Sequence, residues 1–234
     1  MPIFQIVLVL LISYLLGSIP FGLVVVRIFT GKDVRTIESG RTGGTNAMRA
    51  AGYPVGLLTT CLDIFKGAST MWLVNWLAAG YAWVRVAAAV LVVIGHNYSI
   101  YLIERKEDGR LRLRGGAGGT PALGGAIALW PMSALIIIPI AVFVFAFVGY
   151  ASLATISIGL TALIIFIIRA SMGLSPWVYV LYAVIAEGLI LWALRPNLKR
   201  LAAGTERVVG FRAARKKRNP PPGRTEDDNG SCDG

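Results

Sequence analysis

The stretch that decides the fold stands at the start of the chain: IFQIVLVLLISYLLGSIPFGLVVVRI, residues 3–28. Its only charged residue is Arg27, and its length exceeds the roughly 20 apolar residues that cross a bilayer core of about 30 Å. It has no basic segment before it and is longer than the hydrophobic part of a secretory signal peptide. We therefore interpret it as a first membrane span that the protein retains.

The rest of the chain repeats this character. Hydrophobic residues make up 56% of the sequence and charged residues 15%, and the mean hydropathy is +0.67. Six more apolar runs follow, at residues 55–77, 83–103, 120–129, 132–147, 152–168 and 176–194. Lipid offers no partners to free backbone groups, and the short alternating segments of a β-barrel do not appear, so the spans must be helices.

The sequence thus predicts an all-α, polytopic membrane protein with about seven transmembrane helices. The runs at 120–129 and 132–147 are short and separated only by Trp130 and Pro131. Two half-length helices and one kinked, re-entrant hairpin are both compatible with this pattern.

Lysine and arginine predict the orientation. They gather in the segments 27–49 and 105–114 and after residue 195, whereas the other connections carry few. With seven crossings, the positive-inside rule places these three segments and the C-terminus in the cytoplasm and the N-terminus outside. Attraction to anionic lipid headgroups accounts for the net charge of +11 more simply than nucleic acid does.

Composition also divides the chain and narrows its chemistry. Residues 212–234 are rich in charge, proline and glycine, which predicts a disordered basic tail after an integral membrane domain at 1–211. Cys61, Cys232 and the single histidine, His96, form no metal-ligand pattern, and no P-loop or Ser-His-Asp order is visible. We expect neither a metal nor a cofactor, and no inverted repeat supports a transporter.

Two glycine-rich segments stand out in the predicted cytoplasmic regions. RTIESGRTGGTNAMRAAG, residues 35–52, combines glycines, hydroxyls and arginines, which suit a phosphate-type anion; an ordinary basic loop is the alternative. RGGAGGTPALGG, residues 114–125, places glycines before a helix, with Thr120 near the N-cap and Pro121 in the first turn. Such an N-terminus binds anions, although small residues also allow close helix packing.

Asp63, Lys66 and His96 are ionisable residues that lie inside predicted spans. Asp63 and Lys66 are three residues apart and share a helix face, so they form either a functional pair or a structural ion pair. His96 in the third span is more typical of a structural hydrogen-bonding group than of a catalytic base.

These pieces together resemble the bacterial acyl-phosphate:glycerol-3-phosphate acyltransferase (PlsY) family, from residue 17 to residue 206. The stretches that carry the resemblance are DVRTIESGRTGGTNAMRAAG (33–52), DIFKG (63–67), GHN (95–97) with GGAGGTPALG (115–124), YASLAT (150–155) and RPNLKRLAAGTE (195–206). The resemblance implies an enzyme of the bacterial plasma membrane whose active site faces the cytoplasm. It would transfer a fatty acyl group from acyl phosphate to the 1-hydroxyl of glycerol 3-phosphate, giving lysophosphatidic acid and phosphate in phospholipid synthesis.

The resemblance also implies roles for individual residues, with the lipid bilayer as surroundings, a monomer as the expected state and no nucleic-acid partner. Catalytic roles fall to Ser39, Arg49 and Asn197. Substrate-binding roles fall to Arg41, Gly43, Thr45, Asn46, Gly115, Gly116, Gly118, Thr120 and Ser152. Supporting roles fall to Asp33, Arg35, Asp63, Lys66 and His96.

The chain departs from the family pattern at three positions. The family's lysine in the second glycine segment is Ala117 here, its histidine before the last motif is Leu194, and an asparagine of the first motif is Arg41. Ala117 and Leu194 favour an alternative reading, a membrane protein without catalysis that binds phospholipid or phosphate esters as a regulator or partner subunit. Our hypothesis is that Arg41, together with Arg112 or Arg114, restores the positive charge.

Overall fold

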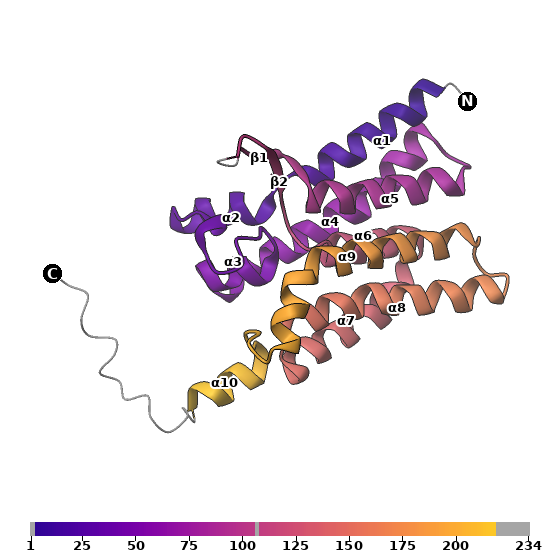
Figure 1. The fold of residues 1–234 in the computed structure, drawn as a ribbon. Coiled ribbons are helices and arrows are strands. Elements are labelled where there is room, and N and C mark those ends of the chain that lie inside the picture. The colour runs from indigo at the N-terminus through magenta and orange to yellow at the C-terminus, as the bar shows by residue number, and fades with distance from the viewer. Residues whose placement is uncertain (1–2, 106–107, 219–234) are drawn as a thin grey trace.

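A computed structural model describes residues 3–105 and 108–218 and arranges the apolar runs as a helical bundle (Figure 1). The helices are α1 (Ile3–Ser18), α2 (Phe21–Thr30), α3 (Gly44–Ala51), α4 (Tyr53–Leu77), α5 (Ala82–Asn97), α6 (Gly119–Leu129), α7 (Ala134–Phe143), α8 (Ala151–Ser171), α9 (Val178–Ala202) and α10 (Gly210–Arg218). Short 3₁₀ turns lie at Val34–Thr36 (η1) and Pro131–Ser133 (η2), and a π-helical turn lies at Val144–Val148 (η3). Strands β1 (Ser99–Arg105) and β2 (Leu111–Arg114) pair as an antiparallel hairpin.

The predicted membrane character is confirmed. Four helical stretches of the described residues are long and apolar enough to cross a bilayer: Ile3–Thr30, Pro131–Val148, Ala151–Ser171 and Val178–Ala202. The helices Ala82–Asn97 and Gly119–Leu129 are apolar but shorter. The all-α prediction holds apart from the small hairpin, whereas the number of seven spans and the orientation stay predictions.

The first predicted span, residues 3–28, is two helices rather than one. Helix α1 ends at Ser18 and α2 begins at Phe21, with Pro20 between them. Proline lacks a backbone N–H and its ring clashes with the preceding turn of a helix, so the apolar run continues while the helix does not. The break leaves the carbonyl of Ile19 free to accept a hydrogen bond from Lys66 of α4.

The predicted third span, 83–103, extends too far, because α5 ends at Asn97. The hydroxyl of Ser99 donates to the carbonyl of Ser18 at 2.5 Å, and the residues after it pair with β2. The apolar side chains of β1 therefore continue the hydrophobic pattern in a strand, which a count of apolar residues does not distinguish from a helix.

The remaining boundaries agree more closely. The two short runs are separate helices, α6 and α7, joined through η2 after Trp130. The predicted disordered tail begins inside α10, since that helix extends to Arg218. Residues 219–234 of the predicted tail lie outside the described residues.

Glycines allow the central helices to pack with their backbones in contact. A Cβ atom on Gly67 of α4 would lie 2.4 Å from the Pro121 carbonyl oxygen of α6, and one on Gly124 would lie 2.1 Å from that of Ile64. Both distances exclude a side chain, so small residues are required for this approach. The core beside it contains Tyr182 of α9, whose hydroxyl donates to the Ala122 carbonyl at 2.6 Å.

Candidate active site

The polar segments gather at one end of the bundle. Figure 1 shows α2, α3 and the β1–β2 hairpin together at that end, opposite the N-terminus and the α8–α9 connection. There a cavity of about 230 Å³, which we call the inner cavity, opens between the loop 38–46, the start of α6, the start of α8 and the last turns of α9. A wider outer cavity of about 880 Å³ adjoins it beneath the hairpin and shares Glu38, Ser39, Arg41, Asn197 and Arg200 with it.

The first glycine-rich segment folds around the side chain of Asn46. Its amide nitrogen lies within hydrogen-bond distance of the carbonyl oxygens of Val34 (3.0 Å), Ile37 (2.9 Å) and Arg41 (2.9 Å). Asn46 is buried at the start of α3, so these contacts hold the loop against the helix and direct Ser39 and Arg41 to the cavity. We interpret Asn46 as a residue that shapes the loop in addition to lining the cavity.

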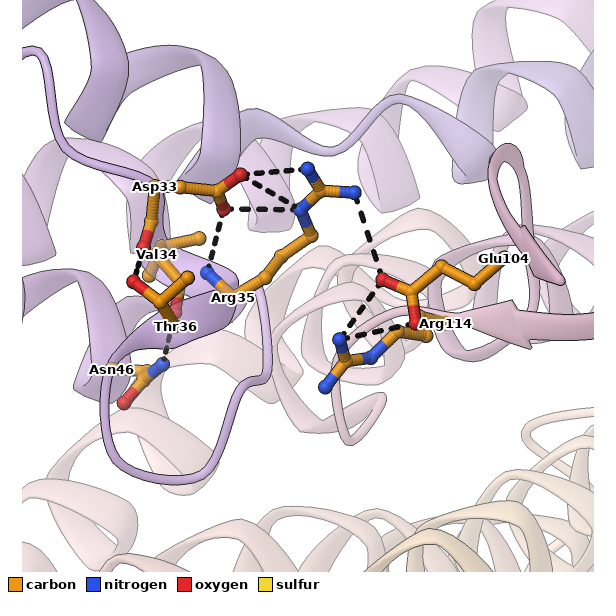
Figure 2. A network of polar contacts seen from close by, with 7 residues as sticks. All are labelled: Asp33, Val34, Arg35, Thr36, Asn46, Glu104 and Arg114. Carbon is orange, nitrogen blue, oxygen red and sulfur yellow. Dashed lines mark hydrogen bonds and ion pairs between the residues drawn. The ribbon is translucent and has the colours of Figure 1, made fainter. Parts of the chain in front are cut away.

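Asp33 and Arg35 fix the start of the same loop (Figure 2). The Asp33 carboxylate caps η1 by accepting the Arg35 backbone N–H at 2.8 Å, and the Arg35 guanidinium binds it through Nη2 at 2.6 Å. The guanidinium hydrogen bonds lower the pKa of the Asp33 carboxyl to about 2. Neither residue lines the cavities, which agrees with a supporting role.

We expect Asp33→Asn to lower the thermal stability of the protein at pH 7. Because the folded-state pKa of Asp33 lies below its ordinary value of 3.8, its stabilising effect is fully present above about pH 4 and disappears as the pH falls through 2. The pair is solvent-accessible, so the loss should not exceed about 1 kcal/mol. The difference in unfolding temperature between the wild type and the variant should be smaller at pH 3 than at pH 7. An equal difference at both pH values would contradict this.

The hairpin is tied to the loop through Glu104 of β1. Its carboxylate accepts Arg114 Nη1 at 2.9 and 3.2 Å and lies 3.7 Å from Arg35 Nη1, as Figure 2 shows. Arg112 and Arg114 line the outer cavity and not the inner one. The part of our hypothesis in which Arg112 or Arg114 helps Arg41 to restore the positive charge is therefore not supported for the inner cavity, whereas Arg41 lines both cavities.

Arg41 reaches across to α9. Its Nη2 donates to the carbonyl of Ala193, the residue before Leu194, and its Nη1 is buried without a partner among the described residues. Burial lowers the pKa of Arg41, and the nearby Arg200 lowers it further, yet an arginine stays protonated. Arg41 therefore brings a charged donor to the cavity wall formed in part by Ala117 and Leu194.

The second glycine-rich segment also lines the inner cavity, through Ala117, Gly118, Gly119 and Thr120. Gly118 has φ +89°, a left-handed conformation that glycine adopts readily, and is followed by α6, whose first residues Gly119 and Thr120 line the inner cavity. Free amides at the start of a helix can bind an anion. Gly115 and Gly116 lie instead in the outer cavity, and the Gly116 N–H donates to the His96 carbonyl at 2.9 Å.

Glu206 organises the rest of the inner cavity. Its carboxylate accepts the Ser152 hydroxyl at 2.9 Å and the Asn197 amide at 3.1 Å. Our site prediction omitted it, although it is the last residue of the RPNLKRLAAGTE stretch. Ser152 and Asn197 thus line the cavity with one donor each already engaged, while Asn197 Oδ1 is buried without a partner in the described part of the chain.

A buried ionic cluster lies behind the cavity. Lys66 Nζ is 2.9 Å from Asp63 Oδ1, from His96 Nδ1 and from the Ile19 carbonyl oxygen. Asp63, Lys66 and His96 are each at most 4% exposed. Asp63 and Lys66 do not line the cavity, but His96 does.

The structure brings most predicted site residues together. The inner cavity is lined by Ser39, Arg41, Gly43, Thr45, Asn46, Arg49, His96, Gly118, Thr120, Ser152 and Asn197. Sequence reasoning missed lining residues that carry charge, namely Glu38, Arg200, Glu206 and Arg207.

The charge of the inner cavity favours anions. Four arginines line it against two glutamates, and Glu38 is paired with Arg207 while Glu206 is engaged by Ser152 and Asn197. Burial lowers the pKa of Arg49 in α3, and the nearby Glu206 carboxylate offsets part of this shift. With arginines, a helix start and buried acceptors in one space, the cavity suits a ligand that carries both phosphoryl oxygens and hydroxyl groups.

Comparison with known proteins agrees with this geometry. A family profile described as Glycerol-3-phosphate acyltransferase matches residues 7–204. A glycerol-3-phosphate acyltransferase of Thermus thermophilus is 37% identical over 205 residues, covering 87% of this chain and 95% of the relative. That of Rubrobacter xylanophilus is 36% identical over 210 residues, covering 88% and 96%.

The fold is similar as well. A crystal structure of PlsY, an integral membrane glycerol 3-phosphate acyltransferase, in its glycerol 3-phosphate form superposes with a TM-score of 0.75 at 30% identity, covering 89% of this chain and 98% of that one. The lysophosphatidic acid form of PlsY gives a TM-score of 0.71 at the same identity, covering 88% and 95%. Sequence, fold and cavity agree that the chain belongs to the glycerol-3-phosphate acyltransferase family.

Proposed function

We propose that this protein transfers a fatty acyl group from acyl phosphate to the 1-hydroxyl of glycerol 3-phosphate. The hydroxyl oxygen attacks the acyl carbonyl carbon, the bond from that carbon to the phosphate oxygen breaks, and the proton goes to the departing phosphate. The products are lysophosphatidic acid and inorganic phosphate. This activity would supply the first acylated intermediate of phospholipid synthesis.

The observation that carries the proposal is the convergence of Arg41, Arg49 and the start of α6 on one cavity at the end of a membrane bundle. Two phosphate-bearing substrates need such a cationic, amide-rich space. Acyl phosphate has an activated leaving group, so alignment of the substrates and stabilisation of charge suffice for catalysis. We assign no protein nucleophile; Ser39, Arg49 and Asn197 would hold and orient the reacting groups.

The surroundings follow from the same reasoning. The cavity end of the bundle would face the cytoplasm of a bacterial cell, where the basic segments gather and glycerol 3-phosphate is dissolved. The acyl chain would remain in the lipid beside the cavity, and the protein would act as a monomer. A binding protein without catalysis is not favoured, because Arg41 offers positive charge despite Ala117 and Leu194, and relatives across 87–88% of the chain are named acyltransferases.

The test is an assay of the purified full chain with an acyl phosphate and glycerol 3-phosphate, measuring both lysophosphatidic acid and phosphate. We expect equal amounts of the two products. Acyl-CoA in place of acyl phosphate, as the matched donor, should give little product. Binding of glycerol 3-phosphate without turnover of either donor would instead support the non-catalytic alternative.

A further inference from the structure

The buried cluster behind the cavity defines the protonation of His96. Lys66 Nζ is 2.9 Å from His96 Nδ1, and an ammonium group only donates hydrogen bonds. Its other two neighbours, the Asp63 carboxylate and the Ile19 carbonyl, are acceptors at the same distance. Asp63 Oδ1 also lies 3.5 Å from His96 Nδ1, but the Lys66 contact is shorter by 0.6 Å and therefore decides the role of Nδ1. Since Lys66 lies beside Asp63, which compensates its charge, Nδ1 of His96 must be the third acceptor.

A neutral histidine that accepts at Nδ1 carries its proton at Nε2. The contact with Lys66 therefore places the ring proton of His96 on Nε2. His96 is 4% exposed, so water does not solvate the ring freely. His96 nevertheless lines the inner cavity, so a ligand bound in that cavity can accept the Nε2–H.

The donor points to the glycine turn. A Cβ atom added to Gly116 would lie 1.9 Å from His96 Nε2, so the ring edge occupies the space that a side chain at residue 116 would fill. His96 lines the inner cavity with Ala117 and Gly118, directly before the start of α6. The Nε2–H and the free amides of α6 thus lie at the same cavity, where Ala117 has no polar side-chain atom that could bind a ligand.

We propose that His96 binds a phosphoryl oxygen of the substrate through its Nε2–H, and that Lys66 is the positioning residue that fixes this tautomer. The inference rests on the proposed function, because it names a donor for one of its two phosphate-bearing substrates. His96 then acts as neither a catalytic base nor a nucleophile. It contributes a neutral, oriented hydrogen-bond donor whose protonation does not change during the reaction.

Two substitutions separate this role from a structural one. His96→Asn keeps an oxygen acceptor near the Nδ1 position for Lys66 but has no donor that reaches the Nε2 position. His96→Gln places an amide donor near the Nε2 position but takes the acceptor away from Lys66. We expect kcat/KM to fall about 10- to 100-fold in His96→Asn and distinctly less in His96→Gln, with most of the change in KM for the phosphate substrates.

Thermal stability should change in the opposite order, with His96→Gln unfolding at the lower temperature because Lys66 loses an acceptor. A purely structural role predicts that activity and stability fall together, so a His96→Asn protein at least as active as His96→Gln would overturn the proposal. If the wild type forms no lysophosphatidic acid, the proposed function fails by itself. The affinity for inorganic phosphate then tests the His96 inference. We expect His96→Asn to bind phosphate more weakly than His96→Gln, and equal affinities of the two variants would contradict the inference.

Discussion

Arg41→Ala is expected to lower the affinity for glycerol 3-phosphate and kcat/KM by about 10- to 100-fold. The guanidinium is held by the Ala193 carbonyl through Nη2 while Nη1 is buried without a partner in the described part of the chain. A hydrogen bond to a charged group contributes about 1.5–3 kcal/mol, which corresponds to this loss. Ala117 and Leu194 in the same wall have no polar side-chain atoms, so neither residue can replace the charge of Arg41.

The matched variants are Arg41→Lys and Arg85→Ala. Lysine keeps the charge but not the fork that contacts Ala193 and the cavity together, so it should recover only part of the affinity. Arg85 lies in the first turn of α5, at the end of that helix remote from His96, and its removal should leave the affinity unchanged. Arg41→Ala with wild-type affinity for glycerol 3-phosphate would show that the substitution in the first motif does not compensate for the missing lysine.

Lys66→Met is expected to lower the free energy of unfolding by about 3–5 kcal/mol. Asp63 is 0% exposed and Lys66 1%, so removal of the ammonium leaves a buried carboxylate without compensation. Methionine retains the length and the apolar stem of lysine, so the loss reports the charge rather than a cavity. Unfolding of the detergent-solubilised full chain, followed by heat or denaturant, measures it.

The double variant Asp63→Leu with Lys66→Met provides the control. It removes both charges, so it should be more stable than Lys66→Met alone, as buried ion pairs often are when both partners become apolar. Its activity should nevertheless remain below that of the wild type, because His96 loses the group that fixes its tautomer. Unchanged stability of Lys66→Met would contradict the ionic cluster as a structural element.

The helices could be predicted from the sequence because their signal is local. The apolar runs at residues 152–168 and 176–194, for example, correspond to α8 and α9. Their boundaries agree within a few residues, except that α9 continues to Ala202. The break at Pro20 has a local cause, because proline interrupts a helix, but the count of apolar residues that predicted one span does not register it. The end of α5 before Ser99 was not predicted because it depends on a tertiary contact, that of the Ser99 hydroxyl with the Ser18 carbonyl. A strand that follows an apolar helix has no separate signature in a hydropathy count.

The site shows the same division. The glycine-rich segments at 35–52 and 114–125 could be predicted to line an anion-binding cavity because their backbone amides, hydroxyls and arginines suit a phosphate-type anion. The second segment also serves helix packing, since Gly124 packs against the Ile64 carbonyl of α4. It could not be predicted that Arg41 lines both cavities while Arg112 and Arg114 line only the outer one, because this depends on where the hairpin packs. Glu206 was missed because a carboxylate in an anion site is unexpected until its bonds to Ser152 and Asn197 are known.

The position of the phosphate of glycerol 3-phosphate bound to the full chain tests the account most directly, and a crystal or cryo-electron microscopy structure of the complex would measure it. The account predicts the phosphate inside the inner cavity, with its oxygens in contact with at least one of Arg41 and Arg49 and with the start of α6. A phosphate held only in the outer cavity, between Arg112 and Arg195, with the inner cavity empty, would contradict it.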